Sequence, residues 1–148
     1  MRYGILFLAL VALIGGVFAP AAVAAINGLG ASGHDVVAYF DMKPGARAVK
    51  GNARYQAKHS GTMYYFASQE NLDKFRKDPS AYAPQYDGYC AYGVTEGAKI
   101  KSDPNAWSIY QGKLYLNYNR SMRVMWTRNK DANIESANAN WPRVKNRH

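Results

Sequence analysis

The stretch TMYYFASQENLDKFRKDPSAYAPQYDGYC, residues 62–90, decides the fold of this chain. Its first part, Met63–Phe66, is aromatic and predicts a half-buried strand. At Ser68 the pattern changes, and apolar residues then recur at the spacing of a core-facing helix. Pro79 stops that helix, and an aromatic loop leads from it to Cys90. The stretch therefore predicts a strand, a helix and a loop that carries a thiol.

Two β-hairpins and further helices are expected around this stretch. Arg54–His59 alternates in polarity like a strand, and Ser60-Gly61 can turn the chain back into the aromatic strand. A second hairpin is expected over 107–118. A helix that places Trp126 in the core follows it, and a last helical piece is expected to stop at Pro142. The predicted fold class is α+β: a small single domain of β-hairpins packed with helices.

The two predicted hairpins share residues at one fixed offset. The matching pairs are Gly61 and Gly112, Tyr64 and Tyr115, and Phe75 and Trp126. An old duplication would produce this echo, and so would the common geometry of a hairpin that leads into a helix.

Residues 1–24 have the pattern of a secretory signal peptide. A basic start precedes the uncharged apolar run Tyr3–Phe18, and Ala22-Val23-Ala24 is the small-x-small pattern of a cleavage site. We expect cleavage near Ala24 and export to the periplasm or the medium. An uncleaved anchor is the rival reading, although the run is short for a bilayer, which needs ~20 residues.

The rest of the chain divides into three expected parts. Residues 25–33 are rich in glycine and predict a flexible leader, and residues 34–142 form the domain. Residues 143–148 are basic and are expected to be a disordered tail.

The charge of the chain favours anionic partners. Lys and Arg number 19 against 10 Asp and Glu, a formal net charge of +9. A membrane surface, an acidic polysaccharide or an acidic envelope protein would suit this charge. Nucleic acid is not expected, because the chain has an export signal and no recognition motif. A dispersed basic surface that only maintains solubility is the simpler interpretation.

Residues 64–75 and 78–82 together resemble a YHS domain. The motif of that family is an aromatic residue, then Phe-Cys-Ser-x-x-Cys, a later phenylalanine and a Pro-x-x-Tyr element. The residues that match it are Phe66, Ser68, Phe75, Pro79 and Tyr82. The flanking segments 35–40 and 88–93 are similar to a longer, exported group of YHS-like proteins.

The resemblance implies a small α+β module related to treble-clef-like metal domains. It also implies that Ala67 and Asn71 of this chain stand at the two positions where the metal-linked members of the family have cysteines. Neither residue is a thiolate donor, so we do not expect metal binding by that pair.

Three other residues are the candidate metal ligands: His34, His59 and Cys90. Thiolate and imidazole suit both copper and zinc, and we favour copper. The three donors would have to converge from separate segments. A buried, inert thiol and a hydrogen-bonded core histidine are the alternatives at these positions.

Four tyrosines around the cysteine are a candidate ligand or partner surface. They are Tyr82, Tyr86, Tyr89 and Tyr92. The same residues would serve equally as packing in a domain without disulfides.

Together these features predict an exported, non-catalytic binding module of the cell envelope that binds a metal ion or a small ligand near Cys90. A protein-interaction module that uses the basic and aromatic surface is the alternative. A thiol enzyme with a Cys-His pair is a more distant one, because no supporting acid or oxyanion-hole motif accompanies the pair.

Overall fold

The computed structural model describes residues 28–147, so the predicted signal peptide lies outside the described residues. The described chain contains helices and two antiparallel two-stranded sheets, β1-β2 and β3-β4. This confirms the predicted α+β class. Within residues 28–147 no helix has both the length and the apolar character needed to cross a membrane.

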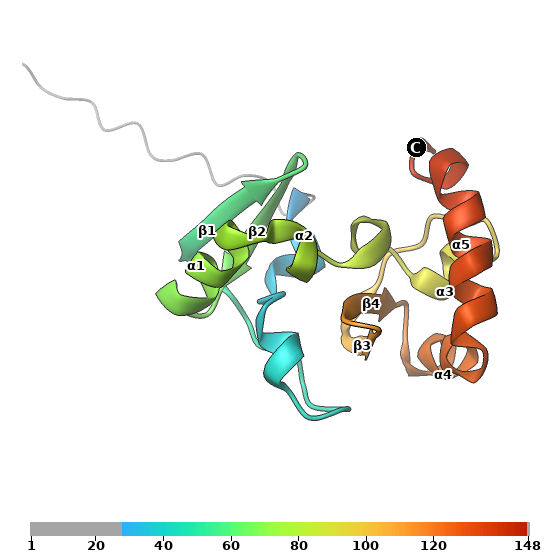
Figure 1. The fold of residues 1–148 in the computed structure, drawn as a ribbon, viewed down its shortest axis with the longest axis horizontal. Helices are drawn as coiled ribbons and strands as arrows, with labels where there is room; N and C mark the ends of the chain where they lie inside the picture. The colour runs from blue at the N-terminus through green and yellow to red at the C-terminus, as the bar shows by residue number, and fades with distance from the viewer. Residues whose placement is uncertain (1–27, 148) are drawn as a thin grey trace, which may run out of the picture.

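The elements follow one another in two runs (Figure 1). The first run is η2 Gly30–Gly33, η3 Ala38–Asp41, β1 Asn52–His59, β2 Thr62–Phe66, α1 Gln69–Lys77 and α2 Pro79–Tyr82. The second run is η4 Gln85–Gly88, α3 Ala91–Thr95, β3 Asp103–Tyr110, β4 Lys113–Asn117, α4 Arg120–Arg128 and α5 Lys130–Val144. The first hairpin with α1 forms one end of the molecule, and the long α5 forms the outer edge of the other end.

The two hairpin-helix units have the same dimensions. Each element of the second unit starts 51 residues after its counterpart: 103 − 52 for β3, 113 − 62 for β4 and 120 − 69 for α4. The ladder of each hairpin shifts register at the equivalent place, between Asn52 and Gln56 and between Asp103 and Trp107. The offset noticed in the sequence therefore extends to the length and pairing of every strand.

The segments before the hairpins also correspond, at an offset of 55. The φ angles at residues 31–33 are 48°, 51° and 77°, and at residues 86–88 they are 56°, 52° and 78°. Asp35 and Cys90 (90 − 35 = 55) follow these left-handed turns. The backbone N–H of Asp35 donates to the carbonyl of Val49, and that of Cys90 donates to the carbonyl of Ile100, both at a distance of 2.8 Å. Each acceptor lies just before the hairpin that follows. The described chain thus contains two similar units, each with a left-handed turn, a hairpin and a helix, although α5 is much longer than its counterpart α2.

A shared core joins the two units. The first core cluster contains Phe66 and Phe75, whose ring centroids are 4.9 Å apart, and also Trp107 and Leu116 from the second hairpin. The second cluster centres on Trp126 and includes buried residues of η4, α3 and α5. Because the second hairpin contributes to both clusters, neither unit closes its core alone.

The predicted flexible leader is wrong for its described part. Gly30–Gly33 forms η2, Ala31 is buried, and Leu29 forms a bridge with Met63 of β2. Gly30 lies directly against the ring of Tyr64, where a Cβ would find no room. Close packing on β2 orders this glycine-rich segment.

Three further expectations differ from the structure after residue 84. Pro142 lies inside α5, which continues to Val144 because that residue is fully buried in the second core. Residues 145–147 are ordered, and the carbonyl of Lys145 accepts a hydrogen bond from Nζ of Lys99 at 3.0 Å. The described part of the basic tail therefore contacts the domain. The expected loop before the second hairpin contains the helices η4 and α3.

Buried tyrosines make the fold sensitive to alkaline pH. Burial raises the pKa of Tyr64 to about 12, with a further contribution from Asp87. Burial also raises the pKa values of Tyr39 and Tyr86. In the unfolded chain tyrosine has a pKa of ~10, so the unfolded chain loses these protons at a lower pH than the folded protein does.

We expect the free energy of unfolding to be insensitive to these groups below about pH 10 and to fall as the pH rises from there towards 12. Tyr64→Phe should make this fall shallower, because it removes one of the groups. Urea unfolding at a series of pH values tests the prediction, with the exposed Tyr118→Phe as the control. An equal slope in all three proteins would contradict it.

Candidate functional site

The three predicted metal donors lie in separate surroundings. His34 Nδ1 is 3.1 Å from the carbonyl oxygen of Ala31, beside η2. His59 ends β1 and packs edge-on against the ring of Phe75, with centroids 6.0 Å apart. Cys90 is fully buried before α3. No group of three His, Cys, Asp or Glu side chains that could hold a metal ion occurs in residues 28–147.

The thiol of Cys90 caps a helix. Its Sγ accepts a hydrogen bond from the backbone N–H of Gly93 at 3.3 Å, as an N-cap residue does. It lies 3.7 Å from Asn117 Oδ1, which also accepts the N–H of Tyr92 at 3.0 Å. The polar contacts of the thiol are thus with a backbone amide and an asparagine, and no histidine is among them.

The four predicted surface tyrosines serve mainly as packing. Tyr82 stands edge-on to Phe40 at 5.2 Å. Tyr86 is 6% exposed, and its hydroxyl donates to Asn138. Tyr89 and Tyr92 are half-buried against the second core. They are divided between the two core clusters and do not form one continuous exposed surface.

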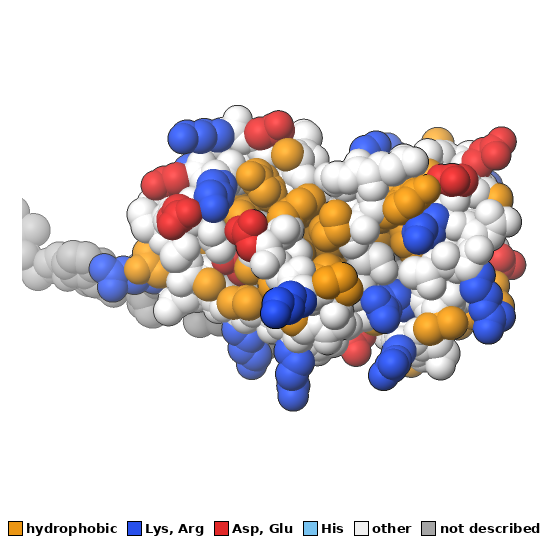
Figure 2. All heavy atoms as spheres, turned by 60° about the horizontal axis from the view of Figure 1, so that its bottom comes forward, with side chains coloured by type: hydrophobic (Ala, Val, Ile, Leu, Met, Phe, Trp, Pro, Cys, Tyr) orange, Lys and Arg blue, Asp and Glu red, His pale blue; other side chains and the backbone are white. Residues whose placement is uncertain are grey.

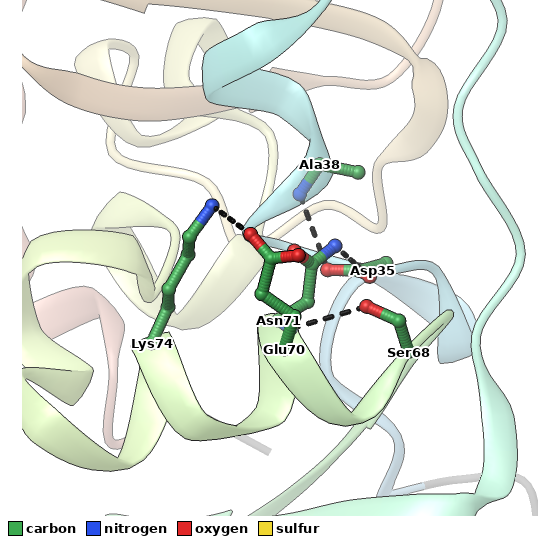
Figure 3. A network of polar contacts seen from close by, with 6 residues as sticks. All are labelled: Asp35, Ala38, Ser68, Glu70, Asn71 and Lys74. Atoms are coloured by element: carbon green, nitrogen blue, oxygen red, sulfur yellow. Dashed lines mark hydrogen bonds and ion pairs between the residues drawn. The ribbon is translucent and has the colours of Figure 1, made fainter.

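A buried carboxylate occupies the place where the family resemblance puts a metal pair (Figure 3). Asp35 is fully buried, and its Oδ1 accepts the N–H groups of Val37 and Ala38 at 2.9 and 3.2 Å. Its Oδ2 accepts the N–H of Ala67 and the Nδ2 of Asn71, both at 2.7 Å. The two cysteine positions of the metal-linked members are therefore used here to bind an aspartate of the same chain.

This polar network is closed. Ser68 caps α1 by accepting the N–H of Asn71 at 3.1 Å, and Glu70 pairs with Lys74 at 2.9 Å on the outer side. Four donors satisfy the Asp35 carboxylate, which is the condition for keeping a charge inside a protein. The network ties η3 to the start of α1 and has a structural role.

A groove lies where the two units meet. It has a volume of about 220 Å³ and is bounded by η3 with the loop after it on one side and by β3 and α4 on the other. Its apolar lining residues are Tyr39, Phe40, Met42, Trp107 and Ile109, of which Tyr39 and Trp107 are almost fully buried. Polar groups make up about half of the exposed wall. The groove is smaller than the sites of drug-sized ligands, which are roughly 300–1,000 Å³, and only a small molecule would fit it.

Hydrogen bonds to backbone carbonyls hold the groove wall in place. The hydroxyl of Tyr39 donates to the carbonyl of Pro104, and Nε1 of Trp107 donates to the carbonyl of Ala46. Both distances are 2.8 Å. The two rings lie 5.4 Å apart at an angle of 59°. Burial raises the pKa of Tyr39, and Asp103 raises it further, so this hydroxyl stays neutral. These contacts fix the two rings beneath the groove.

Basic side chains line the open side of the groove. Arg123 and Thr127 come from α4, and Lys130 from the start of α5. Arg123 also borders a neighbouring hollow of about 330 Å³, together with Arg120 and Asp103. Figure 2 shows apolar side chains between basic ones on one face of the molecule.

Residues 46–86 match the YHS domain family. The match confirms the resemblance carried by the aromatic strand and helix, and it spans β1, β2, α1 and α2. YHS domains are generally associated with the handling of metals, copper in particular. No curated protein and no solved structure matches the chain. Of the second run, the matched span includes only Gln85 and Tyr86 of η4.

Sequence reasoning did not identify Asp35, Arg123 or Lys130. The repeat could have drawn attention to Arg123. Its equivalent in the first unit, 51 residues earlier, is Leu72, which is a buried core residue. A basic residue at a core position of a repeated unit indicates a different local use. Nothing in the sequence alone brings η3 against β3 and α4.

Asp35→Ala is expected to lower the free energy of unfolding by roughly 3 kcal/mol or more, because four buried donors lose a charged acceptor. Guanidinium unfolding measures the change. Asp41→Ala, at an exposed aspartate six residues on, is the matched control and should have little effect. Equal effects of the two substitutions would show that the network does not stabilise the fold.

Cys90 is expected to react with iodoacetamide only slowly in the native protein, since the thiol is fully buried. Cys90→Ala should cost about 1 kcal/mol through loss of the helix cap, whereas Cys90→Ser retains an acceptor and should cost less. Labelling followed by mass spectrometry, with and without denaturant, checks the first point. Fast labelling without denaturant would contradict the buried, capping role.

Proposed function

We propose that this chain is an exported, non-catalytic binding module that holds a small organic ligand in the groove between η3 and the β3–α4 unit. The observation that carries the proposal is the groove itself, in which apolar side chains lie beside polar and basic ones and the residues beneath are held by hydrogen bonds. Binding sites for small molecules combine those two features. The signal-like residues 1–24 support export.

Copper binding is the second candidate, and the YHS match favours it. The ligands would be His34, His59 and Cys90, which would have to leave their present contacts and converge. Titration of the mature domain with Cu(I) and Zn(II) tests this candidate. Stoichiometric binding that is lost in both Cys90→Ser and His59→Ala would favour it over the groove.

A protein-interaction module is the third candidate. Its support is a set of exposed apolar side chains next to or within the basic helix α4: Tyr118, Val124 and Met125, which are 52%, 41% and 42% exposed. The surface offers no enclosed site, so the groove remains the better-supported location.

The groove is tested by filling it. Ser108 lines it from β3, and Ser108→Phe would place a ring in the space now open to a ligand. We expect small aromatic compounds that bind the wild type, detected by ligand-observed NMR, to lose binding in this variant. Ser80→Phe, an exposed position on α2, is the matched control and should retain it.

Thr127→Phe fills the same groove from α4 and serves as a second variant should Ser108→Phe unfold. Thermal unfolding monitored by circular dichroism establishes which variants are folded. If both folded variants bound the compounds as well as the wild type, the groove would not be the binding site.

A further inference from the structure

We propose that the ligand of the groove is a small aromatic or apolar carboxylate, whose carboxylate group lies between Arg123 and Lys130 and whose apolar part lies against the partly buried Phe40 and Ile109. The inference rests on the proposed function of the groove and assigns its ligand class. It is argued from charge, from the repeat and from the size of the site.

The charged groups that line the groove have one sign. Arg123 and Lys130 are its charged residues, and its lining contains no aspartate or glutamate. Within residues 28–147 the one ion pair is Lys74–Glu70, on α1 of the other unit. Neither basic residue of the groove is therefore neutralised by a carboxylate of the described chain, which favours an anionic ligand.

Arg123 retains donors for such a ligand. One of its nitrogens, Nη1, donates to the carbonyl of Trp107 at 3.2 Å, which fixes the side chain at the groove. A guanidinium has five N–H donors in a planar fork, so a carboxylate can bind it through the remaining ones. The contact with Trp107 orients the fork before the ligand binds, and this lowers the entropic cost of binding.

Lys130 supplies a second positive charge. Its Nζ lies 4.9 Å from the centre of the Tyr110 ring, and the hydroxyl of that tyrosine donates to Asp131 at 2.8 Å. Asp131, the residue after Lys130, therefore accepts a hydrogen bond from Tyr110 and forms no ion pair with Lys130. The ammonium group of Lys130 retains donors that can contact the ligand.

The structural repeat shows that Arg123 departs from the pattern of the unit. Its counterpart in the first unit is Leu72, which is 3% exposed and packs in the first core. A half-buried guanidinium at such a position loses hydration and receives no acid in return. A bound carboxylate would compensate for that loss.

The second hollow limits the charge of the ligand. Arg120 adds a cation there, but Asp103 lines the same hollow and would repel a second negative group. The arrangement suits a monoanion whose charge stays near Arg123. The partly buried side chains of Phe40 and Ile109 then supply apolar surface for the rest of the ligand.

The size of the groove points to a small ligand. Its volume of about 220 Å³ lies below the roughly 300–1,000 Å³ of sites for drug-sized molecules. One or two fused rings with a short acidic side chain fit this space better than a long lipid chain.

Matched ligand pairs test the inference. Indole-3-acetate and 2-naphthoate are compared with their neutral amides by isothermal titration calorimetry at low salt. In the wild type we expect each carboxylate to bind about tenfold more tightly than its amide, as a charge-assisted contact with Arg implies. Higher salt should reduce this preference.

Arg123→Gln and Lys130→Gln should each lower the ratio of amide to carboxylate Kd, and the double variant should bring it close to one. Lys58→Gln, at an exposed lysine on β1 of the other unit, is the control and should keep the wild-type ratio. The ratio reports on charge recognition, and a general loss of stability would not change it selectively.

The remaining outcomes separate the two proposals. If carboxylates and amides bound equally to the wild type and Ser108→Phe abolished both, the ligand class would be wrong and the groove function would stand. If the double variant kept the preference, the roles of Arg123 and Lys130 would be overturned. If no member of either pair bound, and a wider neutral panel also failed, both proposals would fall together.

Discussion

The buried carboxylate of Asp35 is the contact on which the rest of the first unit depends. It accepts bonds from the start of η3 and, more than thirty residues further along the chain, from Ala67 after β2 and from Asn71 of α1. A charge inside a protein is stable only when all its acceptor sites are used, so these segments are held in one relative position. That position places η3, and with it Tyr39, at the edge of the groove.

The repeat explains why the chemistry of the two units differs at equivalent places. Cys90 stands where Asp35 stands in the first unit, and each accepts a backbone N–H near the start of a short helix. The thiol is a weaker acceptor than a carboxylate and reaches only Asn117 beyond its own helix. The one cysteine thus has a structural reason for its position, one that does not require a metal or a substrate.

The YHS match and the groove concern different parts of the molecule. The matched residues 46–86 form the hairpin-helix of the first unit, where Ala67 and Asn71 serve Asp35. The groove is lined by η3 and by the second unit, from which Arg123 comes. The first unit has an internal hydrogen-bond network at the positions of that metal pair, and the groove that we propose as the ligand site lies outside the matched residues.

The sequence by itself determined the secondary structure of the matched unit, its resemblance to the YHS family and the spacing of the two hairpins. These depend on local patterns: aromatic strands, Gly turns and the caps Ser68 and Asn119. It could not show that Gly30–Gly33 is ordered or that α5 passes through Pro142, since burial against distant residues overrides local preference there. Only the tertiary structure separated His34, His59 and Cys90 and brought Tyr39 to Arg123. Such contacts join segments far apart in the chain, and they depend on how the two units pack.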